Sequence, residues 1–346
     1  MKARTAADFR ETHDPSTIIA RLTSEVEKAR RESDEVAAVR SVLAEMGALL
    51  AAVKPPAWTL KAARDPGSPG VPTLFLSDLH WGERVDPAQI GGVNEYGLAI
   101  ARRRLHCCVE TAISLCRIID PKMRYEGVVV ALGGDMISGN IHEELTATNQ
   151  INSMPAVLDL FGELCAAIRV LADAFGAVRL PCVSGNHGRD TRKIWAKDRH
   201  HTSFDWLLYQ FLARHFKDDK RVTFEIPDGP DAPFSIFGTR YLLTHGDRLG
   251  HGGDGLIGFL GPVVRGDHKR RSRNSQISQP YDVLLCGHWH QYAHLPKLVV
   301  NGSLKGYDEY AYTEAFSFEP PQQALWITHP RKGITFRMPV FCEAPK

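Results

Sequence analysis

Short apolar runs of β type alternate with longer stretches of helical spacing along most of this chain, and the alternation limits the folds open to it. Five such runs cover residues 73–76, 127–132, 178–183, 240–244 and 282–286. Helical spacing of apolar residues fills the intervals at residues 93–119, 155–175 and 204–216. Strands that alternate with helices predict an α/β core.

The sequence beyond the fifth run is mostly strand-like. It predicts strands at residues 298–300, 324–328 and 334–339. Residues 223–226 and 234–237 lie earlier in the chain and predict a hairpin of their own. No internal repeat or low-complexity tract interrupts the pattern.

The N-terminal part, residues 1–72, lacks this alternation of predicted strands and helices. Residues 1–54 predict a helical segment, because apolar residues recur by three and four over residues 36–53 and form a short heptad seam. Residues 55–72 are rich in proline and glycine and predict a linker, so the main domain is expected over residues 73–346. Two interpretations of the helical segment stay open: it packs on the main domain, or it joins copies of the chain into a homo-oligomer.

Composition bounds the kinds of partner and compartment. The 42 basic and 40 acidic side chains give a net charge of +2, so anion binding must come from local patches. The seven cysteines form no CxxC motif, which is typical of reduced thiols in a reducing compartment. The N-terminus lacks a signal-peptide pattern, and no apolar run approaches ~20 residues. We therefore expect a cytoplasmic protein with no membrane segment.

Each of the five runs is followed by a turn with the side chains of a metal site. In chain order the turns read Ser77-Asp78-Leu79-His80, Gly133-Gly134-Asp135, Ser184-Gly185-Asn186-His187, His245-Gly246-Asp247 and Gly287-His288-Trp289-His290. Ligands of α/β sheets bind beyond the carboxyl ends of the strands, so these turns should converge. Asp, His and Asn donors without cysteine suit Mn, Fe, Zn or Ni. About seven donors suit two ions that share a carboxylate, and such a pair can clamp a phosphoryl group.

The order DxH, GD, GNH, H and GHxH, each after a predicted strand, resembles the calcineurin-like metallophosphoesterases. The resemblance covers about residues 73–303 and includes the turn Asn301-Gly302-Ser303. It implies an α/β fold in which a β-sandwich is flanked by helices, here with the N-terminal helical segment as an appendage. It also implies hydrolysis of phosphoesters with two divalent metal ions, for which Mn²⁺ is the first choice and Fe, Zn or Ni are alternatives.

The resemblance also implies a role for each residue of the five motifs. Asp78, His80 and His290 would bind the first ion, Asn186, His245 and His288 the second, and Asp135 would bridge both. His187 would bind no metal but would donate a proton to the leaving oxygen or stabilise its charge. An imidazole suits that role because it titrates near neutral pH.

The sequence departs from the family pattern at the residue after His187. Members commonly carry Asp or Glu there, which orients the histidine, whereas this chain has Gly188. Asp190 is a candidate to replace that carboxylate. Residues 136–138 offer no arginine in the GD motif, which argues against the protein Ser/Thr phosphatase branch.

Two basic stretches, residues 189–201 and 265–273, stand out in a nearly neutral chain. A charged run is often only a solvated face, but both are expected to be loops that flank the metal centre, and together they favour a polyanion such as nucleic acid. The candidate substrate-binding residues are Arg189, Lys269, Arg270 and Arg271. Tyr281, Trp289 and Tyr292 could stack on bases, although core packing is the favoured interpretation. The pair His200-His201 is interpreted as surface.

The sequence therefore predicts a metal-dependent nuclease, with DNA the favoured substrate. It is similar to the DNA-repair nuclease branch and to phage-type phosphoesterases. A phosphomonoesterase or a cyclic-nucleotide phosphodiesterase is the alternative enzyme. A catalytically silent binding subunit on the same fold is the alternative of another class, and the complete ligand set argues against it.

Overall fold

The computed structural model describes residues 23–24, 27, 54–61, 67–250 and 258–343. The chain divides into two units, residues 1–49 and 50–346, and the described residues of the first unit are helical. The helical segment predicted over residues 1–54, and the homo-oligomer through it, fall almost wholly outside the described residues and stay predictions. The helices and strands named in the following paragraphs belong to the second unit.

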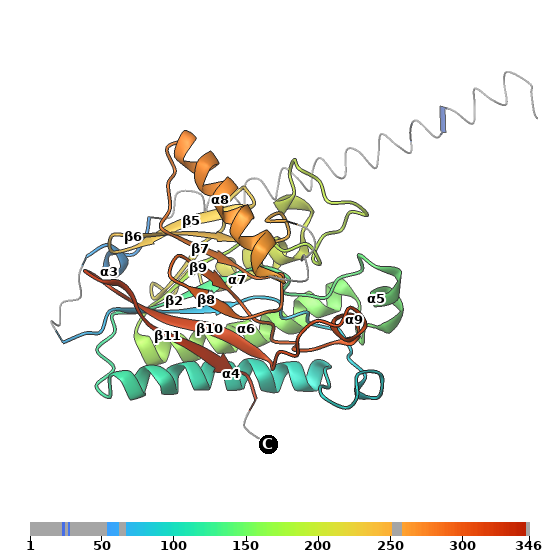
Figure 1. Cartoon of the computed structure of the whole chain (residues 1–346), viewed down its shortest axis with the longest axis horizontal. Helices are drawn as coiled ribbons and strands as arrows, with labels where there is room; N and C mark the ends of the chain where they lie inside the picture. Colours follow the sequence, from blue (N-terminus) through green and yellow to red (C-terminus); the bar gives the residue numbers. More distant parts are fainter. Residues whose placement is uncertain (1–22, 25–26, 28–53, 62–66, 251–257, 344–346) are drawn as a thin grey trace, which may run out of the picture. The chain divides into compact units, whose positions relative to one another are not determined.

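Two sheets form the centre of this unit (Figure 1). The first has the order β11-β10-β1-β2-β3-β4 and contains β1 (Val71–Leu76), β2 (Val128–Leu132), β3 (Val178–Pro181), β4 (Val222–Glu225), β10 (Gln322–His329) and β11 (Gly333–Phe341). Strands β1 to β4 are parallel, whereas β10 and β11 are antiparallel to their neighbours. The parallel strands are buried throughout in β1, β2 and β3, as expected for a sheet covered on both faces.

The second sheet has five strands in the order β5-β6-β7-β9-β8. They are β5 (Asp231–Ile236), β6 (Thr239–Thr244), β7 (Val283–Cys286), β8 (Ala293–Leu295) and β9 (Leu298–Val300). Side chains alternate across this sheet: Leu285 of β7 joins the core between the two sheets, while Leu284 and Cys286 face the other way. The inter-sheet core also contains Phe75 and Trp326 of the first sheet, so the sandwich predicted from the resemblance is present.

Three long helices lie against the six-stranded sheet (Figure 1). They are α4 (Leu98–Ile119), α6 (Ser153–Phe175) and α7 (Phe204–His215). In α4 the buried residues Leu105, Cys108, Val109 and Ala112 recur by three and four, which is the period that predicted the helix. The second unit also contains short helices α3 (Ala57–Leu60), α5 (Glu143–Thr148) and α9 (Glu309–Thr313), and the 3-10 turns η1 (Pro87–Gln89) and η2 (His200–Thr202).

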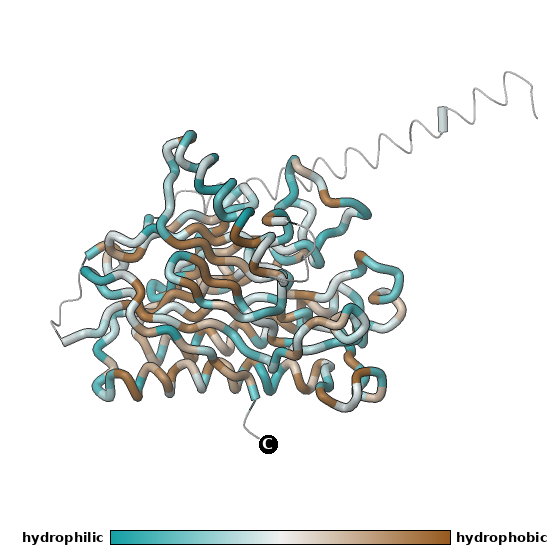
Figure 2. The backbone as a smooth tube through the Cα atoms, viewed as in Figure 1, coloured by the Kyte–Doolittle hydropathy of each residue, from teal (hydrophilic) through white to brown (hydrophobic). Residues whose placement is uncertain are grey.

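Helix α8 (Leu260–Gln276) corrects one prediction. Residues 265–273 were expected to form a loop beside the metal centre, but they form the middle of this helix. The helix packs Val263 against Leu284 and Cys286 on the outer face of the second sheet. From Arg265 onward its side chains are nearly all charged or polar, and Figure 2 shows it among the hydrophilic parts of the chain. The narrow apolar face explains why no helical period is visible in the sequence.

The predicted hairpin of residues 223–226 and 234–237 is also wrong. The two segments form β4 and β5, but β4 pairs in parallel with β3, whereas β5 pairs with β6 in the other sheet. The chain therefore crosses from one sheet to the other between them. None of the described helices is long and apolar enough to span a membrane.

Candidate metal centre

The five motif turns meet at the carboxyl ends of β1, β2, β3, β6 and β7, as the sequence predicts. A first group of donors consists of Asp78, His80 and His290. His80 Nε2 lies 2.9 Å from His290 Nε2, which in turn lies 3.5 Å from Asp78 Oδ1. Two imidazole nitrogens that face each other at this distance need a proton or a cation between them. The group therefore fits one divalent ion.

A second group surrounds His245, whose ring is buried. His245 Nε2 lies 3.0 Å from Asp135 Oδ2 and 2.9 Å from Asn186 Oδ1. The ring of His288 is 5.2 Å from that of His245. His245 Nδ1 lies 2.9 Å from the Gly133 carbonyl, to which it must donate, so Nε2 is the nitrogen that faces the donors.

Asp135 connects the two groups. It can share an ion with His245 and His288, and its carboxylate also lies within 4.8 Å of ligand atoms of His80 and His187. The structure thus brings Asp135 between the two predicted ion sites, where a bridging carboxylate belongs. All seven predicted metal ligands, Asp78, His80, Asp135, Asn186, His245, His288 and His290, lie in these two groups.

The electrostatics of the centre suit cations. Burial would lower the pKa of His245, but Asp135, Asp78 and Asp247 raise it to about 10. Burial and the neighbouring His245 lower the pKa of His288 to about 4. Buried carboxylates thus hold a positive charge on one imidazole while its neighbour is kept neutral. A divalent ion would supply that positive charge and take the neutral imidazoles as ligands.

The backbone of the ligand turns is strained. Five predicted ligands have φ between 48° and 71°: Asp78, His80, Asp135, His288 and His290. Non-glycine residues rarely adopt this left-handed region, and such strain persists where the surroundings impose it, often at functional sites. The strained backbone at these five residues costs local stability, and it directs their side chains toward the metal centre.

Asp78 is fixed by several groups around it. The backbone N–H of His288 donates to both carboxylate oxygens at 3.0 and 3.1 Å, and the Ser77 hydroxyl donates to Oδ2 at 2.5 Å. A Cβ on Gly287 would lie 2.2 Å from Asp78 Oδ2, so the GHxH turn needs glycine to approach this closely. The Ser303 hydroxyl donates to the Asp78 carbonyl at 2.9 Å, which gives the Asn-Gly-Ser turn a positioning role.

His187 lies beside the centre and has a defined orientation. Its backbone N–H donates to Asp135 Oδ1 at 2.7 Å, and its Nδ1 lies 3.0 Å from the Ser138 carbonyl. Because a carbonyl only accepts, Nδ1 carries the hydrogen, and Nε2 is left for a substrate. Burial lowers the pKa of His187. The ring centroid is 4.6 Å from that of His80, so the His187 side chain lies beside the first group of donors.

The carboxylate that supports the GNH turn is Asp205, which the sequence analysis did not single out. Its buried oxygens accept backbone N–H groups of Asp135 and Gly185 at 2.9 Å each. A Cβ on Gly188 would lie 2.7 Å from Asp205 Oδ1, so the departure from the family pattern makes room for this carboxylate. Asp190 is exposed, and its backbone N–H donates to Thr202. Asp205 lies in the first turn of α7, where an Asp is common because it interacts favourably with the helix dipole. Its position in the sequence is therefore only weak evidence for a role at the metal centre.

A buried charge network behind His80 was also missed. Glu83 Oε2 lies 3.4 Å from His80 Nδ1, within ion-pair distance but outside hydrogen-bond geometry. Lys305 Nζ contacts Glu83 at 2.8 Å and Asp308 at 2.5 Å. A carboxylate behind a metal-binding imidazole orients the ring and raises its basicity, so Glu83 and its partners support the first group.

The candidate substrate-binding residues fall in two places. Arg189 lies at the centre, where its Nη1 donates to the Asn186 carbonyl at 2.7 Å. Lys269, Arg270 and Arg271 belong to α8. Lys269 is exposed, Arg270 pairs with Asp231 at 2.6 Å, and Arg271 pairs with Asp267 at 2.8 Å. Tyr281 is buried, and Trp289 and Tyr292 pack against the two cores, in agreement with the core interpretation.

Comparisons with known proteins give only distant matches. No family model and no curated protein matches this sequence. Among solved structures, a variant of Vps29 from Entamoeba histolytica is 11% identical over 78% of this chain and 99% of its own, with a TM-score of 0.29. The sulfate thiohydrolase SoxB from Thermus thermophilus is 12% identical over 80% of this chain and 57% of its own, with a TM-score of 0.30. A protein named as a 5'-nucleotidase from Staphylococcus aureus is 12% identical over 80% of this chain and 55% of its own, with a TM-score of 0.32.

This chain thus spans little more than half the length of the last two proteins. TM-scores this low support no inference about activity. The structure itself contains the two facing sheets, the flanking helices and the five convergent turns within the described residues. The structure therefore confirms the predicted α/β architecture of two facing sheets with flanking helices, in which the motif turns converge.

Proposed function

We propose that this protein is a dinuclear metal-dependent phosphoesterase that hydrolyses phosphodiester bonds in nucleic acid, with DNA the favoured substrate. One observation carries the proposal: donors from five separate turns converge in two groups, with Asp135 between them. The donor set contains carboxylates, imidazoles and an amide but no thiolate, so Mn²⁺ is the first choice among the metals that suit it.

Two bound divalent ions would activate water and neutralise charge on the phosphate that reacts. The chain's own residues would do the rest. Arg189, next to Asn186, adds a guanidinium for a phosphate oxygen. His187, held through Nδ1 by Ser138, presents Nε2 to the leaving oxygen and would act as the general acid.

The loop that follows the GNH turn suits a polyanion. Residues 190–199 form irregular structure, as expected from the sequence, and lead into η2. Arg192, Lys193 and Lys197 are exposed there, and Trp195 is 46% exposed among them. Basic side chains that alternate with an exposed aromatic ring are typical of surfaces that bind single-stranded nucleic acid, because the charges follow the backbone and the ring stacks on a base.

An exposed aromatic segment lies next to the GHxH turn. Gln291 Nε2 donates to the Ser317 carbonyl at 3.0 Å, which ties the segment to the metal centre. Its exposed rings are Tyr310, Tyr312, Phe316 and Phe318. Stacking on such rings stabilises bound bases by ~1–3 kcal/mol each. The segment therefore favours a substrate with nucleobases over a simple phosphomonoester.

The test compares substrates directly. Wild-type protein with Mn²⁺ should cleave single- or double-stranded DNA, or RNA, faster than chromogenic phosphomonoesters. Asp135→Ala should lose both ions of the centre and all hydrolysis, whereas Asp218→Ala, an exposed acid after α7, should keep both. Wild-type protein with no bound or activating divalent metal would contradict the proposal.

The same panel separates the alternatives. A preference for monoesters would favour the phosphomonoesterase, and turnover of cyclic nucleotides alone would favour the cyclic-nucleotide phosphodiesterase. Metal binding without turnover of any substrate would leave the silent binding subunit as the best account.

A further inference from the structure

A second cluster of potential metal ligands lies outside the centre described above. His200 and His201 of η2 and Asp228 each offer a ligand atom, and these atoms lie within 4.8 Å of one another. His200 Nε2 is 4.0 Å from Asp228 Oδ1. The two imidazole rings are 3.9 Å apart between centroids and inclined at 59°. Two adjacent histidines are thus turned toward the same carboxylate.

The ring nitrogens of this cluster lack partners. The Nε2 atoms of both His200 and His201 are buried, and neither has a hydrogen-bond partner among the described residues. A buried polar side-chain atom without a partner needs an explanation, and an ion that it can bind is one such explanation. The side chain of Asp228, in contrast, is 60% exposed. The cluster therefore has a buried nitrogen side and a side open to water.

We propose that His200, His201 and Asp228 bind a further divalent ion, Zn²⁺ by its ligand preference. Two imidazoles, a carboxylate and a water form a donor set that tetrahedral zinc accepts. Zinc lies about 2.0–2.2 Å from such ligands, so the three side chains must close on it by roughly 1 Å. The exposed Asp228 side chain can supply that movement because little packs against it.

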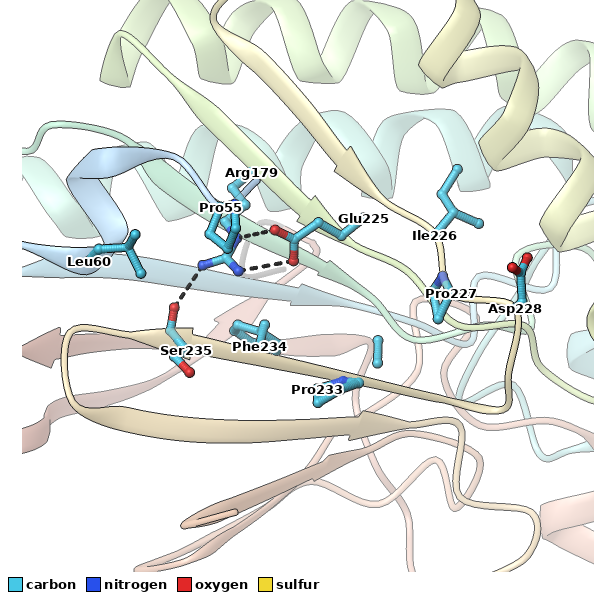
Figure 3. Close-up of a pocket in the computed structure, with 11 residues that line it drawn as sticks. Pro55, Leu60, Arg179, Glu225, Ile226, Pro227, Asp228, Pro233, Phe234 and Ser235 are labelled. Carbon is cyan, nitrogen blue, oxygen red and sulfur yellow. Dashed lines mark hydrogen bonds and ion pairs between the residues drawn. The ribbon is translucent and has the colours of Figure 1, made fainter. Parts of the chain in front are cut away.

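The position of the site gives the ion a structural role. Asp228 lies on the segment between β4 and β5, where the chain crosses from one sheet to the other. It also lines a cavity of about 470 Å³ beside the Arg179–Glu225 ion pair (Figure 3). An ion bound here would fasten this crossing segment to the loop that carries η2.

That loop also reaches the metal centre. Arg199, the residue before His200, pairs with Asp247 at 2.9 Å and donates to the Gly185 carbonyl at 3.2 Å. Gly185 and Asp247 belong to two of the motif turns. An ion bound by His200, His201 and Asp228 would therefore hold the neighbouring Arg199 in place. It would do so without contacting the predicted ligands of the metal centre.

Metal content distinguishes this site from the centre. Full-length wild type, Asp135→Ala, His201→Ala and the double variant are loaded with Zn²⁺, desalted and measured by elemental analysis. Asp135→Ala should retain about one equivalent, and the double variant none. His201→Ala should lose about one equivalent relative to wild type, and a control, His268→Ala on the exposed side of α8, should lose none.

Loading Asp135→Ala with Co²⁺ should give the visible absorption of a tetrahedral N/O site, and His201→Ala should abolish it. If His201→Ala does not fold, Asp228→Asn, which changes an exposed side chain, should weaken Zn²⁺ binding by at least about tenfold. Folded Asp135→Ala without zinc, or equal zinc content with and without His201, would overturn the proposal. Neither result would bear on hydrolysis by the dinuclear centre.

Discussion

At the scale of single residues, the predicted acid and the metal ligands can be separated. His187 contacts Asp135 through its backbone N–H, but its side chain is held by the Ser138 carbonyl. His187→Ala should therefore retain both ions while kcat falls by ~10²–10⁴-fold. Metal content and steady-state hydrolysis by the same preparation check this. Loss of metal would make His187 a ligand, and unchanged kcat would exclude it as the acid.

Lys305 gives the clearest test among the supporting residues, because it alone neutralises two buried carboxylates in the described network. Lys305→Met keeps the length of the side chain but leaves Glu83 and Asp308 without that cation. Breaking such a pair should lower the free energy of unfolding by ~3–5 kcal/mol, measured by chemical denaturation. Lys332→Met, at an exposed turn, should change it by less than about 0.5 kcal/mol.

The effect of Lys305→Met should depend on pH. Burial would raise the pKa of Asp308, but Lys305 lowers it to about 2. A depressed carboxyl pKa stabilises the folded state above the unfolded value of ~3.9, and that stability is lost as pH falls toward 2. The difference between wild type and variant should be full at neutral pH and narrow below about pH 4. A difference that grows on acidification would contradict this assignment.

Single residues were predictable from sequence where their chemistry was local. Asp135 and His288 stand in glycine-containing turns directly after apolar runs, and that position is informative by itself. Asp205 and Glu83 support the centre from elsewhere in the chain. Asp205 sits in the first turn of α7, and Glu83 belongs to no motif. Their roles depend on three-dimensional contacts that no spacing encodes.

At the scale of elements, the sequence was sufficient to predict the strands that are buried, but it was not sufficient to predict which strands pair with each other. Strands β1, β2 and β7 are buried throughout and consist almost wholly of apolar residues, so they were visible in the sequence. Strands β4 and β5 are close neighbours in sequence but belong to different sheets, and only tertiary structure assigns them. Strand β8 is short and half-buried, and the sequence analysis missed it.

The element most suited to bind a phosphate backbone is the loop of residues 189–201 rather than α8. Replacing Arg192, Lys193 and Lys197 with Ala should weaken DNA binding and flatten the slope of log affinity against log salt by up to ~0.9 per lost duplex phosphate contact. A small chromogenic diester should be hydrolysed almost as before. Binding isotherms at several salt concentrations check this.

The matched comparison for that loop is Arg265→Ala with Lys269→Ala, which removes two exposed charges from α8. This variant should keep the wild-type salt dependence. A larger effect of the α8 variant than of the loop variant would restore Lys269 as a substrate contact. Equal and negligible effects would remove nucleic acid as the substrate class.

At the scale of the whole molecule, metal binding at the centre should raise the free energy of unfolding. Five strained ligand residues in three turns and two buried carboxylates destabilise the metal-free protein, so ions that bind only the folded state should stabilise it by mass action. Mn²⁺ at 100 times its Kd should add ~2.7 kcal/mol per site, and chelation should lower Tm. Thermal unfolding with and without Mn²⁺ measures this. Asp135→Ala should show little of the increase, and an equal increase would place the stabilising ions elsewhere.

The pairing of β1 with β10 has a consequence for how the chain reaches this structure. The Ser77 N–H bonds to Gln323, 246 residues away, and His288 bonds to Asp78 across 210 residues. Contacts of such sequence separation form late and slow folding, because a long loop must close before they stabilise anything. During synthesis on the ribosome, one edge of β1 would stay unpaired until β10 emerges. An unpaired strand edge can pair with another chain and so promotes aggregation. The ligand set would be completed only after the GHxH turn has been synthesised, so a chain released before His290 would lack the assembled centre.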